Sequence, residues 1–69
     1  MNITELDMAT RLEIYIRNVE QALEQARASA PPDSRVREIL DIVEAYVRDS
    51  RYYLSRGDYF TALSTITYA

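Results

Sequence analysis

Arginine and tyrosine side chains recur at helical spacing in the second half of the chain. Arg48, Tyr52 and Arg56 follow one another at intervals of four residues, and Arg51 lies beside them. In a helix, this spacing places the first three on one side. A guanidinium group can hold a phosphate with two parallel hydrogen bonds, and a tyrosine ring can stack on a base. These four residues could therefore contact an anion, a nucleotide or RNA.

The same residues also have a structural interpretation. Glu44 and Asp49 lie near these arginines in sequence and could neutralise them, while the tyrosine rings cover the end of a helical bundle. Tyrosine occurs six times in 69 residues, and all eight cations are arginine. These two residue types are enriched as anchors of protein interfaces. We therefore favour a structural role or a protein interface for this face, with nucleotide or RNA contact as the alternative.

The side chains that most often catalyse reactions are missing. The chain has no histidine and no cysteine, so it has neither an imidazole or thiolate metal ligand nor a nucleophile of the Ser-His or Cys-His type. Its single glycine cannot build a phosphate-binding loop. The remaining carboxylates flank the apolar stripes and are expected in solvent: Glu13, Glu20, Glu24, Glu38, Asp41, Glu44 and Asp49. We expect a protein that is not an enzyme, with no catalytic residues, no metal and no cofactor.

Composition narrows the class of protein further. A chain of 69 residues forms one domain, here 1–69, and buries only about 60% of its unfolded surface. Its net charge of -3 argues against sequence-independent nucleic-acid binding, which depends on basic residues. No apolar run approaches the ~20 residues that span a bilayer, and the polar segment 1–7 is unlike a signal peptide. We expect a cytoplasmic protein with no membrane association.

Segment 4–28 has the periodicity of an amphipathic helix. Its apolar residues recur at alternating steps of four and three: Leu12, Ile16, Val19, Leu23 and Ala26. Thr4 is the expected N-cap. The sequence Ala30-Pro31-Pro32 ends the helix, because a residue before proline is disfavoured in the α conformation.

Two further helices are expected over 34–56 and 58–69. The first is capped by Asp33 or Ser34 and ends at Gly57, and Asp58 caps the second. The apolar face of 34–56 comprises Val36, Ile39, Leu40, Val43, Tyr46, Val47 and Leu54. Tyr46 and Tyr53 are expected to point inward, where Asp49 could accept a hydrogen bond from one hydroxyl.

Short connections predict an all-α fold, an antiparallel up-down-up three-helix bundle with a long hairpin and a short third helix. The third helix is only about 17 Å long against about 33–36 Å for the others. It should cover 3–12 of the first helix and 46–54 of the second. The rest of the hairpin would then present an open apolar groove, which also includes Ala22 and Ile39. The expected partner-binding residues are Val19, Leu23, Ala26, Val36, Leu40 and Val43. We expect a second copy, forming a homodimer, or a helix of a partner protein to cover this groove.

The C-terminal third resembles a known family. The runs that carry the resemblance are 44–54, 56–63 and 66–69, which contain an alanine-tyrosine, an acidic residue, a tyrosine pair, a glycine-aspartate turn and a final tyrosine-alanine. Together they resemble DUF357, a family of small archaeal proteins of unknown function. The resemblance implies a helical hairpin followed by a third helix, and it implies no activity. Family members usually continue past the tyrosine-alanine with a histidine-glycine and another helical stretch, which would lie over the open groove.

Overall fold

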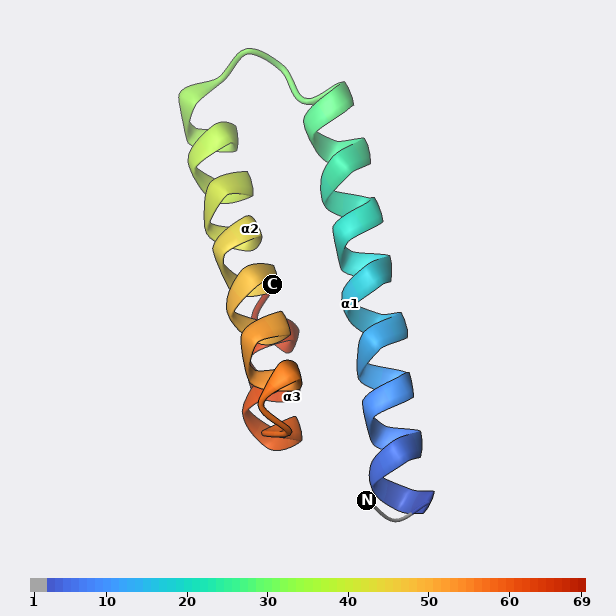
Figure 1. Cartoon of the computed structure of the whole chain (residues 1–69). Coiled ribbons are helices and arrows are strands. Elements are labelled where there is room, and N and C mark those ends of the chain that lie inside the picture. Colours follow the sequence, from blue (N-terminus) through green and yellow to red (C-terminus); the bar gives the residue numbers. More distant parts are fainter. Residues whose placement is uncertain (1–2) are drawn as a thin grey trace.

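The computed structural model describes residues 3–69, and the side chains from Asp7 onward. This part of the chain forms three helices, α1 (Ile3–Ser29), α2 (Ser34–Ser55) and α3 (Tyr59–Thr67). The two long helices pair as an antiparallel hairpin, and the short third helix folds back along α2 (Figure 1). The predicted all-α fold, with a long hairpin and a short third helix, is confirmed. The molecule is elongated, with extents of 47 × 16 × 14 Å.

Aspartate caps determine where two of the helices begin. The side chain of Asp33 accepts a hydrogen bond from the amide of Arg35 at 2.8 Å, and that of Asp58 accepts one from the amide of Thr61 at 3.1 Å. Each bond satisfies an amide that has no partner within its own helix. The prediction for Thr4 is wrong, because α1 already includes Ile3. The side chain of Thr4 lies outside the described residues.

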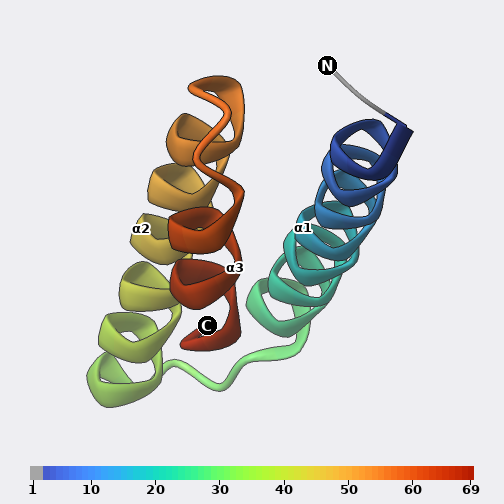
Figure 2. The same ribbon diagram turned by 90° about the horizontal axis from the view of Figure 1, so that it is seen from below.

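A glycine turn reverses the chain between α2 and α3. Gly57 has a φ of 77°, the left-handed conformation that favours glycine. Its amide donates to the carbonyl of Leu54 at 3.0 Å, and the amide of Asp58 donates to the carbonyl of Tyr53 at 3.0 Å. This pair of bonds is the Schellman pattern that ends a helix. The turn directs α3 back along α2, on the side that also faces α1 (Figure 2).

The core lies where the three helices meet. Ile16 of α1, Val47 of α2 and Ile66 of α3 form one buried cluster. Val19, Val43 and Leu54 pack against its edges. The third helix therefore reaches Ile16, about one turn farther along α1 than the predicted limit at residue 12. No helix within residues 3–69 is long and apolar enough to cross a membrane.

Candidate interaction surfaces

The hairpin has two halves that differ in burial. The covered half comprises α3 and the residues that it packs against, up to Ile16 in α1 and from Val47 in α2. The loop half comprises residues 19–44, except Glu20, whose side chain pairs with Arg51 of the covered half. All buried residues in the part of the chain that the structure describes lie in the covered half: Leu12, Ile16, Val47, Ser50, Ala62 and Ile66. The six predicted partner-binding residues of the loop half are only half-buried: Val19, Leu23, Ala26, Val36, Leu40 and Val43.

The loop half also exposes large apolar side chains. Ile39 is 59% exposed and Ile42 is 54% exposed, and Ala22 of α1 is exposed as well. Helical spacing places Ile39 and Val43 on one side of α2, in line with Tyr46, which stacks on Tyr68 just after α3. The apolar stripe of α2 thus runs past the end of α3 without interruption. We call the apolar side of the loop half the open face; it comprises Val19, Ala22, Leu23 and Ala26 of α1 and Val36, Ile39, Leu40 and Val43 of α2.

Ion pairs join the two long helices in both halves. In the covered half, Arg51 donates to both carboxylate oxygens of Glu13, at 3.0 and 3.1 Å, and its Nε donates to both oxygens of Glu20 at 3.2 Å. In the loop half, Arg27 donates to Asp41 at 2.9 Å and also to Glu44. Glu13, Glu20 and Arg27 are spaced by seven residues, so they lie on one side of α1.

These contacts change the pKa values of the charged groups. Hydrogen bonds to Glu20, and then to Glu13, raise the pKa of Arg51 above its ordinary value. Hydrogen bonds from Arg51 lower the pKa of Glu20. Arg27 has its pKa raised by its bonds to Asp41 and Glu44. Arg51, Glu20 and Arg27 therefore remain charged at neutral pH, and the two arginines link the long helices in both halves.

The structure divides the predicted arginine-tyrosine face. Arg51 turns toward α1 and is neutralised by Glu13 and Glu20. Tyr52 and Arg56 remain together in solvent, with the guanidinium carbon of Arg56 5.6 Å from the centre of the tyrosine ring. Arg48 is exposed on the same side and forms no ion pair with any residue that the structure describes.

Two contacts expected from the sequence are not found among the described residues. Glu44 pairs with Arg27 of the other helix, and Asp49 pairs with none of the nearby arginines. The hydroxyls of Tyr46 and Tyr53 form no hydrogen bond with Asp49. Instead their rings pack on other rings. The ring centres of Tyr46 and Tyr68 are 6.3 Å apart in a stacked arrangement, and those of Tyr53 and Tyr52 are 5.4 Å apart in an edge-to-face arrangement.

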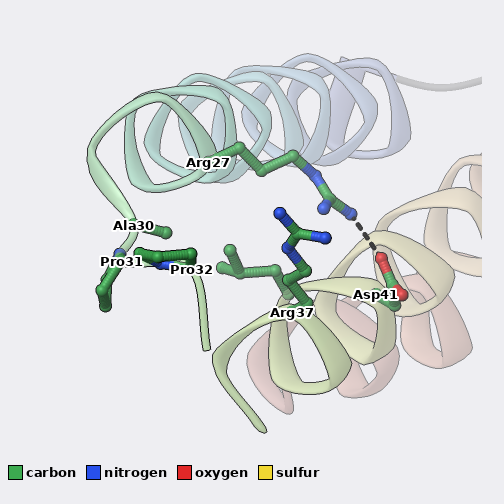
Figure 3. Close-up of a pocket in the computed structure, with 7 residues that line it drawn as sticks. Arg27, Ala30, Pro31, Pro32, Arg37 and Asp41 are labelled. Atoms are coloured by element: carbon green, nitrogen blue, oxygen red, sulfur yellow. Dashed lines mark hydrogen bonds and ion pairs between the residues drawn. The ribbon is translucent and has the colours of Figure 1, made fainter. Parts of the chain in front are cut away.

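A shallow hollow of about 410 Å³ lies beside the interhelical loop. Arg27, Leu40 and Asp41 line it together with the loop residues Ala30, Pro31 and Pro32. Figure 3 shows the side chain of Arg37 pointing toward the same space as that of Arg27. The two carboxylates that pair with Arg27, Asp41 and Glu44, offset the charges of Arg27 and Arg37 together, so the hollow offers little net charge to an anion. Among the side chains that the structure describes, from Asp7 onward, no three potential metal ligands lie close enough together to hold a metal ion.

Sequence reasoning overlooked one buried polar residue. Ser50 has no exposed surface, and its hydroxyl donates to the carbonyl of Ala62 at 2.8 Å, joining α2 to α3. The signal for it was present in the spacing. Apolar residues of α2 at steps of four and three lead from Val43 through Val47 to Leu54, and the intervening position is Ser50. A serine on an apolar stripe requires a partner inside the fold.

Comparison with known proteins supports the resemblance noted in the sequence. The family model described as "Protein of unknown function (DUF357)" matches residues 14–69. The match includes all of α2 and α3 and the part of α1 from Ile14 onward. Neither a curated protein nor a solved structure matches the chain.

Proposed function

Because this chain belongs to the DUF357 family, whose function is unknown, we propose that it is a non-enzymatic interaction module that binds one helix on its open face. One observation carries the proposal. The apolar stripes of α1 and α2 extend along the loop half, but α3 covers only the other half. Monomeric proteins rarely leave such contiguous apolar surface exposed.

The covered half supplies a template for the ligand. There α3 inserts Ala62 and Ile66, four residues apart, between the long helices, and both side chains are buried. The loop half continues the same four-and-three pattern of apolar residues. Its α1 side is lined by the small residues Ala22 and Ala26, which permit the close approach of another backbone. A helix with small and branched apolar residues at this spacing therefore fits the open face.

The helix can come from a second copy of the chain or from a different protein. Both sources would bury the half-exposed side chains of Val36, Val43 and Leu23. The partner has an apolar stripe in both cases, so the two sources share one recognition chemistry. They differ in the identity of the bound helix, which the experiment below determines.

A photo-crosslinking amino acid at Ile39 tests the proposal in cells that make the protein. The side chain is 59% exposed, so its replacement should not disturb folding. The expected result is an adduct whose mass-spectrometric map shows a helix, from this chain or from another protein, joined at position 39. The matched control places the same reagent at Glu38, an exposed position next to it in the sequence. Equal labelling at both positions, or none at position 39, would contradict the proposal.

The alternative function is anion or RNA contact on the exposed side of α2. Its support is the solvent-facing pair of Tyr52 and Arg56, together with Arg48, which forms no ion pair with the side chains that the structure describes. Arg51 adds little, because two carboxylates already occupy its guanidinium group. The double substitution Arg48→Glu and Arg56→Glu tests this function by retention of RNA at physiological salt. Loss of retention would favour RNA contact, and unchanged retention would exclude it.

A further inference from the structure

The third helix and the residues after it carry no charge. Residues 59–69 contain no acidic or basic side chain, although 28% of the chain is charged. One side of α3 packs inward through Ala62 and Ile66. The opposite side faces solvent, where Phe60 is 80% exposed and Leu63 is 44% exposed. The solvent side of a surface helix normally carries polar and charged residues, so this helix is unusual.

Three side-chain hydroxyl groups of α3 are already hydrogen-bonded to carbonyls of the same helix. Ser64 donates to the carbonyl of Phe60 at 3.0 Å, Thr65 to that of Thr61 at 2.7 Å, and Thr67 to that of Ser64 at 2.9 Å. The hydroxyl protons therefore need no other partner. Covering this side with an apolar surface leaves no donor unsatisfied, so its desolvation costs little.

The exposed side of α3 is continuous with an apolar strip on α1. A hollow of about 210 Å³ is lined by Leu63 of α3 together with Met8, Arg11, Leu12 and Tyr15 of α1. Met8 is 40% exposed and Tyr15 is 46% exposed. We call this surface the α3 patch; it comprises Met8, Tyr15, Phe60, Leu63, Ser64 and Thr67. It shares no residue with the open face.

We infer that the α3 patch binds a second copy of the chain, with the two α3 helices antiparallel across a two-fold axis. The spacing of Phe60, Leu63, Ser64 and Thr67 supports a self-complementary contact. An axis that passes midway between Leu63 and Ser64 places Phe60 of one copy opposite Thr67 of the other. It also places Leu63 opposite Ser64. Each large side chain then meets a small one, as close packing requires.

Charge also favours a second copy at this surface. Each chain carries a net charge of -3, so two copies repel one another across most of their surface. An uncharged helix at the axis avoids the direct juxtaposition of like charges, which would weaken an interface. Glu13, Glu20 and Glu44 are engaged along the α1–α2 seam by the arginines of the same chain. The α3 patch is therefore a surface on which two acidic copies can meet without bringing like charges together.

Sedimentation equilibrium over micromolar to millimolar concentrations tests the inference. The wild-type chain should change from the 8.0 kDa monomer to a dimer as the concentration rises. Phe60→Glu and Leu63→Glu should each weaken the dimer about tenfold or more, because a charge must be buried against the partner. Both side chains are exposed in the monomer, so far-UV circular dichroism should show an unchanged fold. Ile39→Glu is the matched control on the open face and should leave the dimer intact.

Cysteine crosslinking tests the register of the dimer, since the chain contains no cysteine of its own. Near the axis, the two copies of Leu63→Cys lie about 1.5 Å apart along the helix direction, whereas two copies of Phe60→Cys lie about 10 Å apart. Oxidation should therefore join the Leu63→Cys copies and not the Phe60→Cys copies. Crosslinking at both positions would show a parallel pair and overturn the register.

Two outcomes would overturn the inference as a whole. One is a monomer at every concentration. The other is a dimer that persists in Phe60→Glu and dissociates in Ile39→Glu. The second outcome would assign self-association to the open face and would support the proposed function. Conversely, an intact α3 dimer with no helix crosslinked at position 39 would leave the inference standing and remove the proposed function.

Discussion

The covered half and the loop half of the hairpin are built from the same sequence pattern, yet only one of them has a core. Both long helices repeat apolar residues at steps of four and three from end to end. Where α3 is present, Ile16 and Val47 are 0% and 5% exposed. Where it is absent, Val36 and Leu40 remain half-buried. Two helices alone leave one side of their seam open, and the third helix closes it.

The two halves also differ in how much their ion pairs are shielded from water. Arg51 in the covered half and Arg27 in the loop half are similarly exposed, at 38% and 36%. Their carboxylate partners differ in exposure between the two halves. Glu13 and Glu20 are 35% and 39% exposed, whereas Asp41 and Glu44 are 70% and 56% exposed. The half that contains α3 therefore has both the tighter packing and the ion pairs that are better shielded from water.

The largest expected difference comes from the same substitution made in each half. Ile16→Ala removes a fully buried side chain and should lower the free energy of unfolding by about 2–5 kcal/mol. Ile39→Ala acts on a side chain that is 59% exposed, so its loss should stay within about 0.5 kcal/mol. Urea denaturation followed by circular dichroism measures both values.

The Ile16→Ala loss is comparable to the whole stability of a small domain, so the variant could unfold. Ile16→Val provides a milder comparison, with an expected loss of about 0.5–1.5 kcal/mol. Ile39→Val is its matched control. Equal losses in the two halves would show that the loop half is buried in solution and would contradict the comparison.

The hydrogen bond between α2 and α3 supplies the next largest effect. Ser50→Ala removes the donor to the carbonyl of Ala62 inside the core and should destabilise the fold by about 1 kcal/mol. It should also increase hydrogen exchange throughout α3. Ser55→Ala is the control, because that exposed hydroxyl bonds only to the carbonyl of Tyr52 in its own helix. If Ser50→Ala and Ser55→Ala behave alike, the buried bond does not hold α3 in place.

The ion pairs of Arg51 and Arg27 test the electrostatic part of the comparison between the two halves. Arg51→Met removes the ion pairs with Glu13 and Glu20 and should cost about 0.2–1 kcal/mol, because these half-exposed groups are partly screened by solvent. Arg27→Met should have a smaller effect, because its partners are more exposed. Denaturation at low and high salt measures both, and salt should reduce each difference. A larger loss for Arg27→Met would reverse the proposed order.

Local sequence signals predicted much of the fold. The 3.6-residue periodicity, the two proline residues, the aspartate caps and the sole glycine mark helix ends that agree with the structure to within one or two residues. The difference in helix length also located the loop half correctly as the part without a buried core. Such features depend on residues that are close together in the chain.

Contacts between distant residues were harder to predict. Proximity in sequence to Arg48 and Tyr52 predicts that Arg51 belongs to the arginine-tyrosine face. Its ion-pair partners in the structure, Glu20 and Glu13, are 31 and 38 residues away. The pairing depends on the rotation and register of two helices, which periodicity alone does not fix. Ser50 was missed for the same reason, since its acceptor belongs to the following helix. The exposed side of α3 is defined by the inward position of Ala62 and Ile66, which depends on the packing of all three helices.

The smallest expected effect concerns the pH dependence of the covered half. Hydrogen bonds from Arg51 lower the pKa of Glu20 below its ordinary value of 4.5. A lowered pKa in the folded state means that this carboxylate stabilises the fold above the unfolded value, and that the contribution is lost as pH falls from 4.5 through the folded value. Glu20→Gln should therefore lower stability by a few tenths of a kcal/mol at neutral pH and make little difference in acid.

Urea midpoints at neutral and acidic pH measure the change. Glu24→Gln, on the same helix, is the control. If Glu20→Gln is as destabilising in acid as at neutral pH, the effect comes from lost packing and the charge of Glu20 does not strengthen the covered half.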